Sequence, residues 1–272
     1  MQKFLKGGQQ IEDNNLINTN GESFVSWNWV ANGGTTVTND ASATGVGDID
    51  SVYQANTTSG FSIVTYTGTG SAGTIAHGLG SKPHWVMTKP RDNSSDGFSV
   101  LHNSLGTNFL DLQTNAKENT NTVVWNSVPT PTVFGVGTAT GSNSSGVKYI
   151  AYCWAPIDGF SKFGQYTGNG STDGTFVYTG FRPAFVLMKR FNSTGNWYLK
   201  DTTRDTFNPC EKTLMPNLTN VEAAQTYIDI LSNGFKQRIG NDASNLTNST
   251  YIYIAFAEHP FVGDGTNPVT AR

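Results

Sequence analysis

The 272-residue chain is poor in charge, cysteine and histidine, and each shortage excludes a class of function. Charged residues make up 14% of the sequence and the net charge is −3, so we predict no basic surface for nucleic acid or anionic lipid. Two cysteines, Cys153 and Cys210, are too few for a disulfide framework. Cys153 lies in an apolar run, which favours a buried free thiol. No window reaches the length of a transmembrane helix and no signal peptide is apparent, so membrane insertion is not expected.

Sequence motifs for metal binding or catalysis are missing too. The four histidines stand at none of the spacings of zinc sites, so we predict neither a metal nor another cofactor. Glycine-rich runs at 68–70 and 168–170 precede no predicted helix, which indicates hairpin turns rather than phosphate-binding loops. The best candidates for the paired acids of a glycan-cleaving enzyme are Asp201 and Asp205, on either side of Arg204. The first half of the chain has no acidic counterparts to them, and we expect no enzyme.

The residues that dominate are Thr, Ser, Asn and Gly, with 30 Gly, 16 Phe, 10 Tyr and 6 Trp. Such a composition is typical of short β-strands joined by polar turns. No amphipathic stretch of helical length separates the apolar runs, which argues against a parallel α/β fold.

A tandem duplication organises most of the sequence. A run that starts at Tyr66 recurs one hundred positions later at Tyr166, and the spacing is kept over the following residues. The matching pairs are Pro83 and Pro183, Trp85 and Phe185, Val86 and Val186, and Lys89 and Lys189. We therefore predict an all-β fold of two tandem antiparallel β-sandwich repeats, jelly-roll-like and about 100 residues each. The predicted divisions are an N-terminal arm and linker at 1–58, one repeat at 59–157 and the other at 158–272.

An apparent orphan strand precedes both repeats. Phe24–Trp29 alternates two sets of side chains and aligns with Tyr149–Trp154, the expected last strand of the first repeat. We interpret it as the last strand of an incomplete third copy. A lone strand must join the edge of a sheet, in this chain or in a neighbouring subunit, so Phe24, Trp27 and Trp29 are the predicted partner contacts.

Tryptophan side chains are the candidates for stacking on sugars. Most of the six lie in hydrophobic strand patterns and are expected in the core. Trp125 is the best candidate for an exposed ligand-binding ring, because the polar Asn126 and a loop with two prolines, Pro129 and Pro131, follow it.

Four motifs together resemble an uncharacterised repeat domain of tailed, often marine, bacteriophage virion proteins that are tail-fibre-like. The motifs are Gly60–Gly68, His77–Pro83, Tyr149–Trp154 and Tyr253–Glu258. The resemblance covers nearly the whole chain and implies a structural virion protein without catalytic residues. This chain holds two repeats and no long shaft, which favours a compact component of the particle over a full-length fibre.

The expected function is therefore a non-enzymatic virion structural protein, at the tail tip or tail fibre and involved in host attachment. The partners would be other virion proteins, further copies of the chain and a host surface glycan or receptor, bound by loops at the ends of the sandwiches. Two alternatives stay open at this point: a capsid decoration or head-fibre protein, and a glycan depolymerase that uses Asp201 and Asp205.

Overall fold

The computed structural model describes residues 3–5, 8–11, 17–93 and 96–260, and it divides the chain into Met1–Val30 and Ala31–Arg272. In the first unit, β1 (Lys3–Leu5) and β2 (Gly8–Gln10) form a short hairpin. Residues 22–31 contain no helix or strand, so the strand predicted at Phe24–Trp29 does not form within this chain. The alternating pattern is present, but a strand forms only as part of a sheet, and residues 22–31 are assigned to none of the sheets of the described residues.

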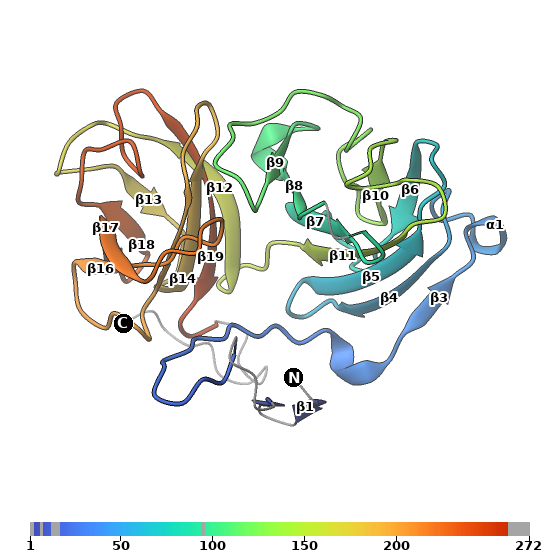
Figure 1. The fold of residues 1–272 in the computed structure, drawn as a ribbon, viewed down its shortest axis with the longest axis horizontal. Coiled ribbons are helices and arrows are strands. Elements are labelled where there is room, and N and C mark those ends of the chain that lie inside the picture. Colours follow the sequence, from blue (N-terminus) through green and yellow to red (C-terminus); the bar gives the residue numbers. More distant parts are fainter. Residues whose placement is uncertain (1–2, 6–7, 12–16, 94–95, 261–272) are drawn as a thin grey trace. The chain divides into compact units, whose positions relative to one another are not determined.

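The first sandwich packs a long sheet against a short one (Figure 1). The long sheet runs in the order β3 (Val37–Asn39), β4 (Ser51–Asn56), β5 (Phe61–Thr67), β11 (Lys148–Trp154), β7 (Trp85–Pro90), β8 (Ser99–His102) and β9 (Phe109–Asp111). The short sheet pairs β6 (Gly73–Ala76) with β10 (Val133–Val136). Over the residues described, three brief helices lie in the connections: η1 (Asn32–Gly34), α1 (Ala41–Thr44) and η2 (Asn103–Leu105). No helix in the described part of the chain is long and apolar enough to cross a membrane.

The second sandwich has an interface sheet and an outer sheet. The interface sheet runs β12 (Ser161–Thr167), β19 (Thr250–Ala257), β14 (Pro183–Arg190) and β15 (Trp197–Asp201). The outer sheet runs β13 (Phe176–Tyr178), β18 (Gly234–Gln237), β17 (Ala223–Leu231) and β16 (Cys210–Thr213). The strands within each sheet are antiparallel, as the predicted all-β sandwich fold requires.

The two sandwiches repeat one strand order. In the long sheet β5, β11, β7 and β8 are neighbours, and in the interface sheet β12, β19, β14 and β15 follow the same succession. The first sandwich then adds β4 and β3 beyond β5. The predicted linker over 32–58 is wrong in this respect. Ser51–Asn56 pairs along β5, and Ile49 is buried in the first core.

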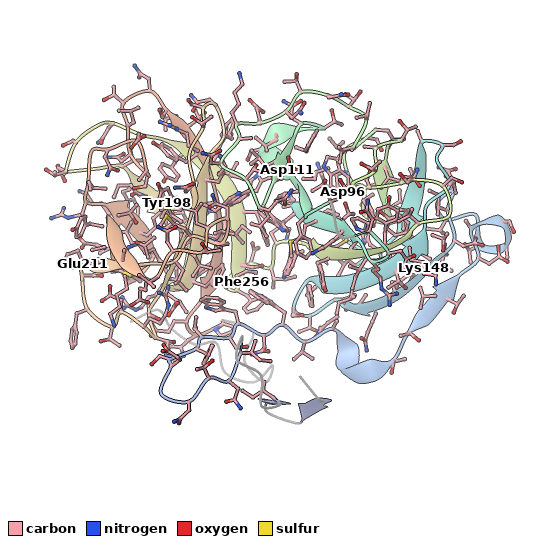
Figure 2. The ribbon with its side chains drawn as sticks, viewed as in Figure 1. Asp96, Asp111, Lys148, Tyr198, Glu211 and Phe256 are labelled. Atoms are coloured by element: carbon pink, nitrogen blue, oxygen red, sulfur yellow. The ribbon has the colours of Figure 1, made fainter. Side chains whose placement is uncertain are left out.

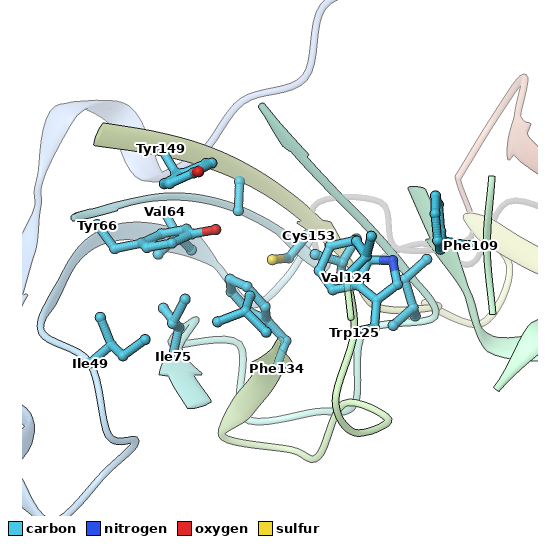
Figure 3. Packing of buried hydrophobic residues seen from close by; sticks show 14 of the residues in the cluster. Ile49, Val64, Tyr66, Ile75, Phe109, Val124, Trp125, Phe134, Tyr149 and Cys153 are labelled. Carbon is cyan, nitrogen blue, oxygen red and sulfur yellow. The ribbon is translucent and has the colours of Figure 1, made fainter. Parts of the chain in front are cut away.

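Each sandwich encloses its own apolar core, built around a stacked pair of tyrosines, and Figure 3 shows the first of the two cores. The ring centroids of Tyr66 and Tyr149 are 5.2 Å apart in the first core, and those of Tyr166 and Tyr251 are 5.0 Å apart in the second. Cys153 and Cys210 are both free and buried. This confirms the prediction of a buried free thiol at Cys153.

A buried asparagine fastens the glycine-rich turn between β5 and β6 and the one between β12 and β13. Asn143 accepts the Thr69 N–H at 2.8 Å and donates to the Ser71 carbonyl at 2.7 Å. Asn245 accepts the Asn169 N–H at 3.1 Å and donates to the Ser171 carbonyl at 2.8 Å.

We call the contacts of Asn143 and Asn245 with these turns the asparagine clasps, and a glycine in each turn takes part in them. Gly70 and Gly170 have φ of 75° and 71°, a region that glycine enters without steric cost. Their N–H groups donate to the backbone carbonyls of Asn143 and Asn245 at 2.9 and 2.8 Å. The glycine-rich runs are thus turns, but the prediction of hairpin turns is wrong, because each run connects the two sheets of its sandwich.

The sandwiches meet through aromatic and hydrogen-bonded contacts. The ring of Trp85 lies edge-on to Trp197 at 5.9 Å, and both side chains are almost fully buried. The indole N–H of Trp197 donates to the Asp111 carbonyl at 3.1 Å. A ring nitrogen of His102 lies 3.3 Å from the Tyr253 carbonyl oxygen. All five residues of β15 are buried, because one face of the interface sheet covers the second core and the other covers the first sandwich.

Candidate functional site

A polar groove crosses one end of the long sheet and encloses about 460 Å³. It is lined by Thr38, Asn39, Asp40, Asp50, Ser51, Val52, Thr65, Tyr66, Thr67, Arg91, Lys148 and Tyr149. Strand register explains the gathering: Thr38 pairs with Val52, Val52 with Thr65, and Lys148 with Thr67. Successive strands therefore present their outward side chains in one row. Figure 2 shows Lys148 at this end of the sheet.

The groove carries acidic groups on one side and basic groups on the other. Asp40 caps α1 by accepting the N–H groups of Ser42 and Ala43, and the Asp50 carboxylate accepts the Ala41 N–H at 2.9 Å. The hydrogen bond from the Ser42 hydroxyl is the main cause that lowers the pKa of Asp40. Neither Arg91 nor Lys148 forms an ion pair with any described residue, so both cations are available to a ligand.

These groups suit a ligand with many hydroxyls. The threonine hydroxyls both donate and accept hydrogen bonds, and the charged groups add acceptors at one side and donors at the other. Asp40 stays ionised at neutral pH, since its pKa is lowered, whereas the proton donor of a glycosidase needs a raised pKa. Asp40 therefore lacks the property that such a proton donor requires.

The prediction for Trp125 is wrong. Its side chain is fully buried in the first core, as Figure 3 shows. The polar residues after it suggested exposure, but the backbone of Val123 and Val124 is held by Gly137, Thr138 and Ala139, and this pairing turns the ring inward. Trp125 is not a surface ligand site.

The predicted partner contacts lie in the first unit. Phe24 is 52% exposed, while Trp27 and Trp29 are half-buried. They belong to no strand, and their role in contacting a partner stays a prediction.

The acids considered for glycan cleavage serve the loop that contains them. The Asp201 carboxylate is buried and accepts the Arg204 guanidinium at 2.6 Å and the backbone N–H groups of Thr203 and Arg204. Asp205 accepts the N–H groups of Glu211 and Lys212. Both carboxylates therefore hold the backbone of their own loop in place.

Two histidines are buried in a neutral form. Burial lowers the pKa of His77 to about 4 and that of His102 to about 3. In each ring Nδ1 accepts a backbone N–H two residues later, from Leu79 and Ser104. Both histidines therefore hold the backbone of the residues that follow them through hydrogen bonds. Among the described residues, no group of His, Cys, Asp and Glu side chains has the arrangement of a metal site.

Sequence reasoning missed two buried lysines in the second sandwich. The Lys200 ammonium donates to the carbonyls of Cys210, Glu211 and Thr226 at 3.1, 2.7 and 2.6 Å. The first two carbonyls lie at an irregularity in the pairing of β16 with β17. Lys189 donates to the Arg190 carbonyl at 2.7 Å. Burial lowers the pKa of each lysine to about 8.

The fold and the groove together define an all-β protein of two joined antiparallel sandwiches with a polar surface groove on the first. Residues 2–260 match the family described as Domain of unknown function (DUF7483), and the chain belongs to this family. The match takes in both sandwiches. No curated protein and no solved structure matches the chain.

Proposed function

We propose that this chain is a non-enzymatic structural protein of a tailed-bacteriophage virion, associated with the tail fibre or tail tip, and that it attaches the particle to a host surface glycan. The observation that carries the glycan-binding part is the groove. One side of it is formed by β3, β4 and the residues between them, which extend the first sandwich beyond the duplicated framework, and the other side by β5, β11 and Arg91. The virion setting rests on the resemblance of the repeat motifs to phage virion proteins.

The buried interface between the sandwiches favours a rigid binding site. The two sandwiches are joined by a buried interface that includes Trp85, Trp197 and His102, so the body that carries the groove has little freedom to deform. A preorganised site loses little conformational entropy when it binds a ligand. The hydroxyl row between Asp50 and Lys148 offers hydrogen bonds without a catalytic acid.

The first experiment locates the protein. Purified virions would be analysed by mass spectrometry and labelled with an antibody against the chain for electron microscopy. The proposal expects the protein in the particle and the label at the tail. Absence from the particle would overturn the proposal. A label on the capsid would instead support the alternative of a capsid decoration or head-fibre protein.

The second experiment tests the groove. Binding of the full chain to purified host surface polysaccharide would be measured for the wild type, for a double variant with Arg91→Ala and Lys148→Ala, and for Lys117→Ala. Lys117 is an exposed lysine outside the groove. A loss of about tenfold or more in affinity is expected for the double variant, with no change for the control. Equal affinities of all three proteins would exclude the groove as the glycan site.

The depolymerase alternative is tested in the same samples. It predicts release of reducing sugar from the polysaccharide, abolished by Asp201→Asn or Asp205→Asn. Because both carboxylates hold backbone N–H groups of their own loop, we expect no such release from the wild-type protein.

A further inference from the structure

The groove on the first sandwich contains a row of side chains that crosses five strands. Asn39 pairs with Ser51 and Ser51 with Tyr66, while Tyr149 pairs with both Tyr66 and Pro90. Tyr66 and Tyr149 point into the first core, so the neighbouring position at this end of each strand points outward. The outward residues, in the order β3, β4, β5, β11 and β7, are Asp40, Asp50, Thr67, Lys148 and Arg91.

Charge is segregated along this row. The two acids, Asp40 and Asp50, stand at one end, and the two bases, Lys148 and Arg91, stand at the other, with Thr67 between them. Neighbouring strands lie about 4.8 Å apart, so the strands of Asp50 and Lys148 are separated by about 10 Å. The acids and the bases of the row form no ion pair with one another. A single ligand in the groove can therefore meet both signs of charge.

The acidic end is held in place and keeps acceptor atoms. Oδ1 of Asp40 accepts the N–H groups of Ser42 and Ala43, and Oδ1 of Asp50 accepts the Ala41 N–H. Oδ2 of both acids accepts no hydrogen bond from a described residue, and an ionised carboxylate offers lone pairs on both oxygens. Two fixed carboxylate oxygens therefore remain for a donor with positive charge.

The basic end keeps its donors. Lys148 and Arg91 are exposed, and neither side chain forms an ion pair with a described residue. Asp92 follows Arg91, but its carboxylate accepts the backbone N–H of Lys148 at 3.2 Å and does not line the groove. The planar guanidinium of arginine matches a carboxylate with two parallel hydrogen bonds, and lysine adds a second positive charge. This end therefore suits an anionic group.

We propose that the groove selects a glycan segment that carries charges of both signs, with an ammonium group beside Asp40 and Asp50 and a carboxylate beside Lys148 and Arg91. An amino sugar linked to a uronic acid has this chemistry. A neutral glycan would leave the four charged groups without partners, and a purely anionic one would meet the acids at one end. Because the two ends differ in sign, the bound segment has one orientation. The inference rests on the proposed glycan binding and adds the class of sugar to it.

Four oligosaccharides of equal length test this selection. De-N-acetylated hyaluronan carries amines and carboxylates, hyaluronan carries carboxylates only, chitosan carries amines only, and a chitin oligosaccharide carries neither. Binding to the full chain would be measured by calorimetry at a pH of about 6, where carboxylates are ionised and the sugar amine is protonated. De-N-acetylated hyaluronan is expected to bind at least about tenfold more tightly than each of the other three.

Variants at the two ends of the row separate the two contributions. Asp40→Asn with Asp50→Asn should remove the advantage of de-N-acetylated hyaluronan over hyaluronan, and asparagine keeps the oxygen that accepts the N–H groups of α1. Arg91→Ala with Lys148→Ala should instead remove its advantage over chitosan. Glu211→Gln, at an exposed residue of the second sandwich, is the control and should keep both differences (Figure 2).

The outcomes distinguish this inference from the proposed function. Equal affinities of the wild type for the four oligosaccharides, or tighter binding of hyaluronan or chitosan, would overturn the selection of mixed charge. So would a failure to bind de-N-acetylated hyaluronan, and if the host polysaccharide still binds, the groove stays a glycan site of another class. Absence of binding to the host polysaccharide as well would overturn both proposals.

Discussion

The two sandwiches share a framework and differ at their edges. In the first, β4 covers the edge of β5, and Asp48 and Ile49 cover the edge of β6. In the second, β12 has β19 as its hydrogen-bonded neighbour and packs Phe163 against His84 of the first sandwich, while β13 pairs with β18 alone over the residues that the structure describes. The repeated strands therefore account for the shared framework, and β3 and β4, which have no counterpart in the second sandwich, add one side of the groove.

The largest difference in stability between the two sandwiches is expected at acidic pH. The buried histidines, His77 and His102, belong to the first sandwich, and burial lowers the pKa of each to about 4 and about 3. Below pH 6.5 the unfolded chain binds protons that the folded chain cannot, so stability present above pH 6.5 is lost as the pH falls. At about 1.4 kcal/mol per pH unit, each histidine costs about 2 to 3 kcal/mol at pH 4.5.

Urea unfolding at pH 7 and pH 4.5, followed by amide exchange, checks this expectation. The first sandwich should lose protection before the second. A pH-independent free energy of unfolding, or histidine resonances that titrate near pH 6.5, would contradict the buried neutral state.

Replacing Lys200 should affect the second sandwich alone. Lys200→Met removes hydrogen bonds from the three carbonyls of Cys210, Glu211 and Thr226 and leaves these acceptors unpaired. We expect a loss of about 3 kcal/mol in the free energy of unfolding. Lys89→Met, in the first sandwich, is the control, because the Lys89 ammonium lies over the ring of Phe98 at 5.2 Å and should contribute less than about 1 kcal/mol. Similar losses in the two variants would refute the special role of Lys200.

The asparagine clasps test whether the sandwiches are equivalent. Asn143→Ala and Asn245→Ala each leave turn carbonyls and N–H groups without their side-chain partner, so each should cost about 2 kcal/mol. The costs should add in the double variant, since the two turns share no residues. Denaturant titration of the three variants measures this, and an effect at only one position would show that the clasp matters in one copy alone.

The smallest effect on stability is expected in the groove. Arg91→Ala with Lys148→Ala removes exposed charges without ion-pair partners among the described residues, so the free energy of unfolding should change by less than about 0.5 kcal/mol. Thermal unfolding of the double variant provides the check. A large loss would mean that these cations hold the sheet together, and the binding experiment would then need other residues.

The duplication made the framework predictable, because equivalent residues such as Tyr66 and Tyr166 do the same structural work in both cores. The edge strands of the first sandwich were harder to predict. Residues 32–58 contain only scattered apolar residues in the sequence. In the structure Ile49 is part of the first core, and Val52 lies in β4, a strand with an exposed face. A strand that borders solvent has too few buried side chains to produce a clear alternation.

The groove could not be predicted, since it depends on the register of strands far apart in the chain, from Thr38 to Lys148. The asparagine clasp left a signal that was available: the Ser142-Asn143 pair recurs as Ser244-Asn245 in the equivalent loops. The prediction of an exposed Trp125 failed because the polarity of neighbouring residues in the sequence does not report which way a ring points when the backbone changes direction. Here the backbone pairs with Gly137, Thr138 and Ala139, and the ring lies in the core.

The contact between Trp85 and Trp197 has an optical consequence. Two indoles from different sandwiches lie 5.9 Å apart at an interplanar angle of 80°, close enough for their electronic transitions to couple. The coupled pair should produce a circular dichroism couplet of opposite-signed bands that vanishes when the sandwiches separate, even while each stays folded. The circular dichroism signal of this pair would therefore report whether the two sandwiches are docked.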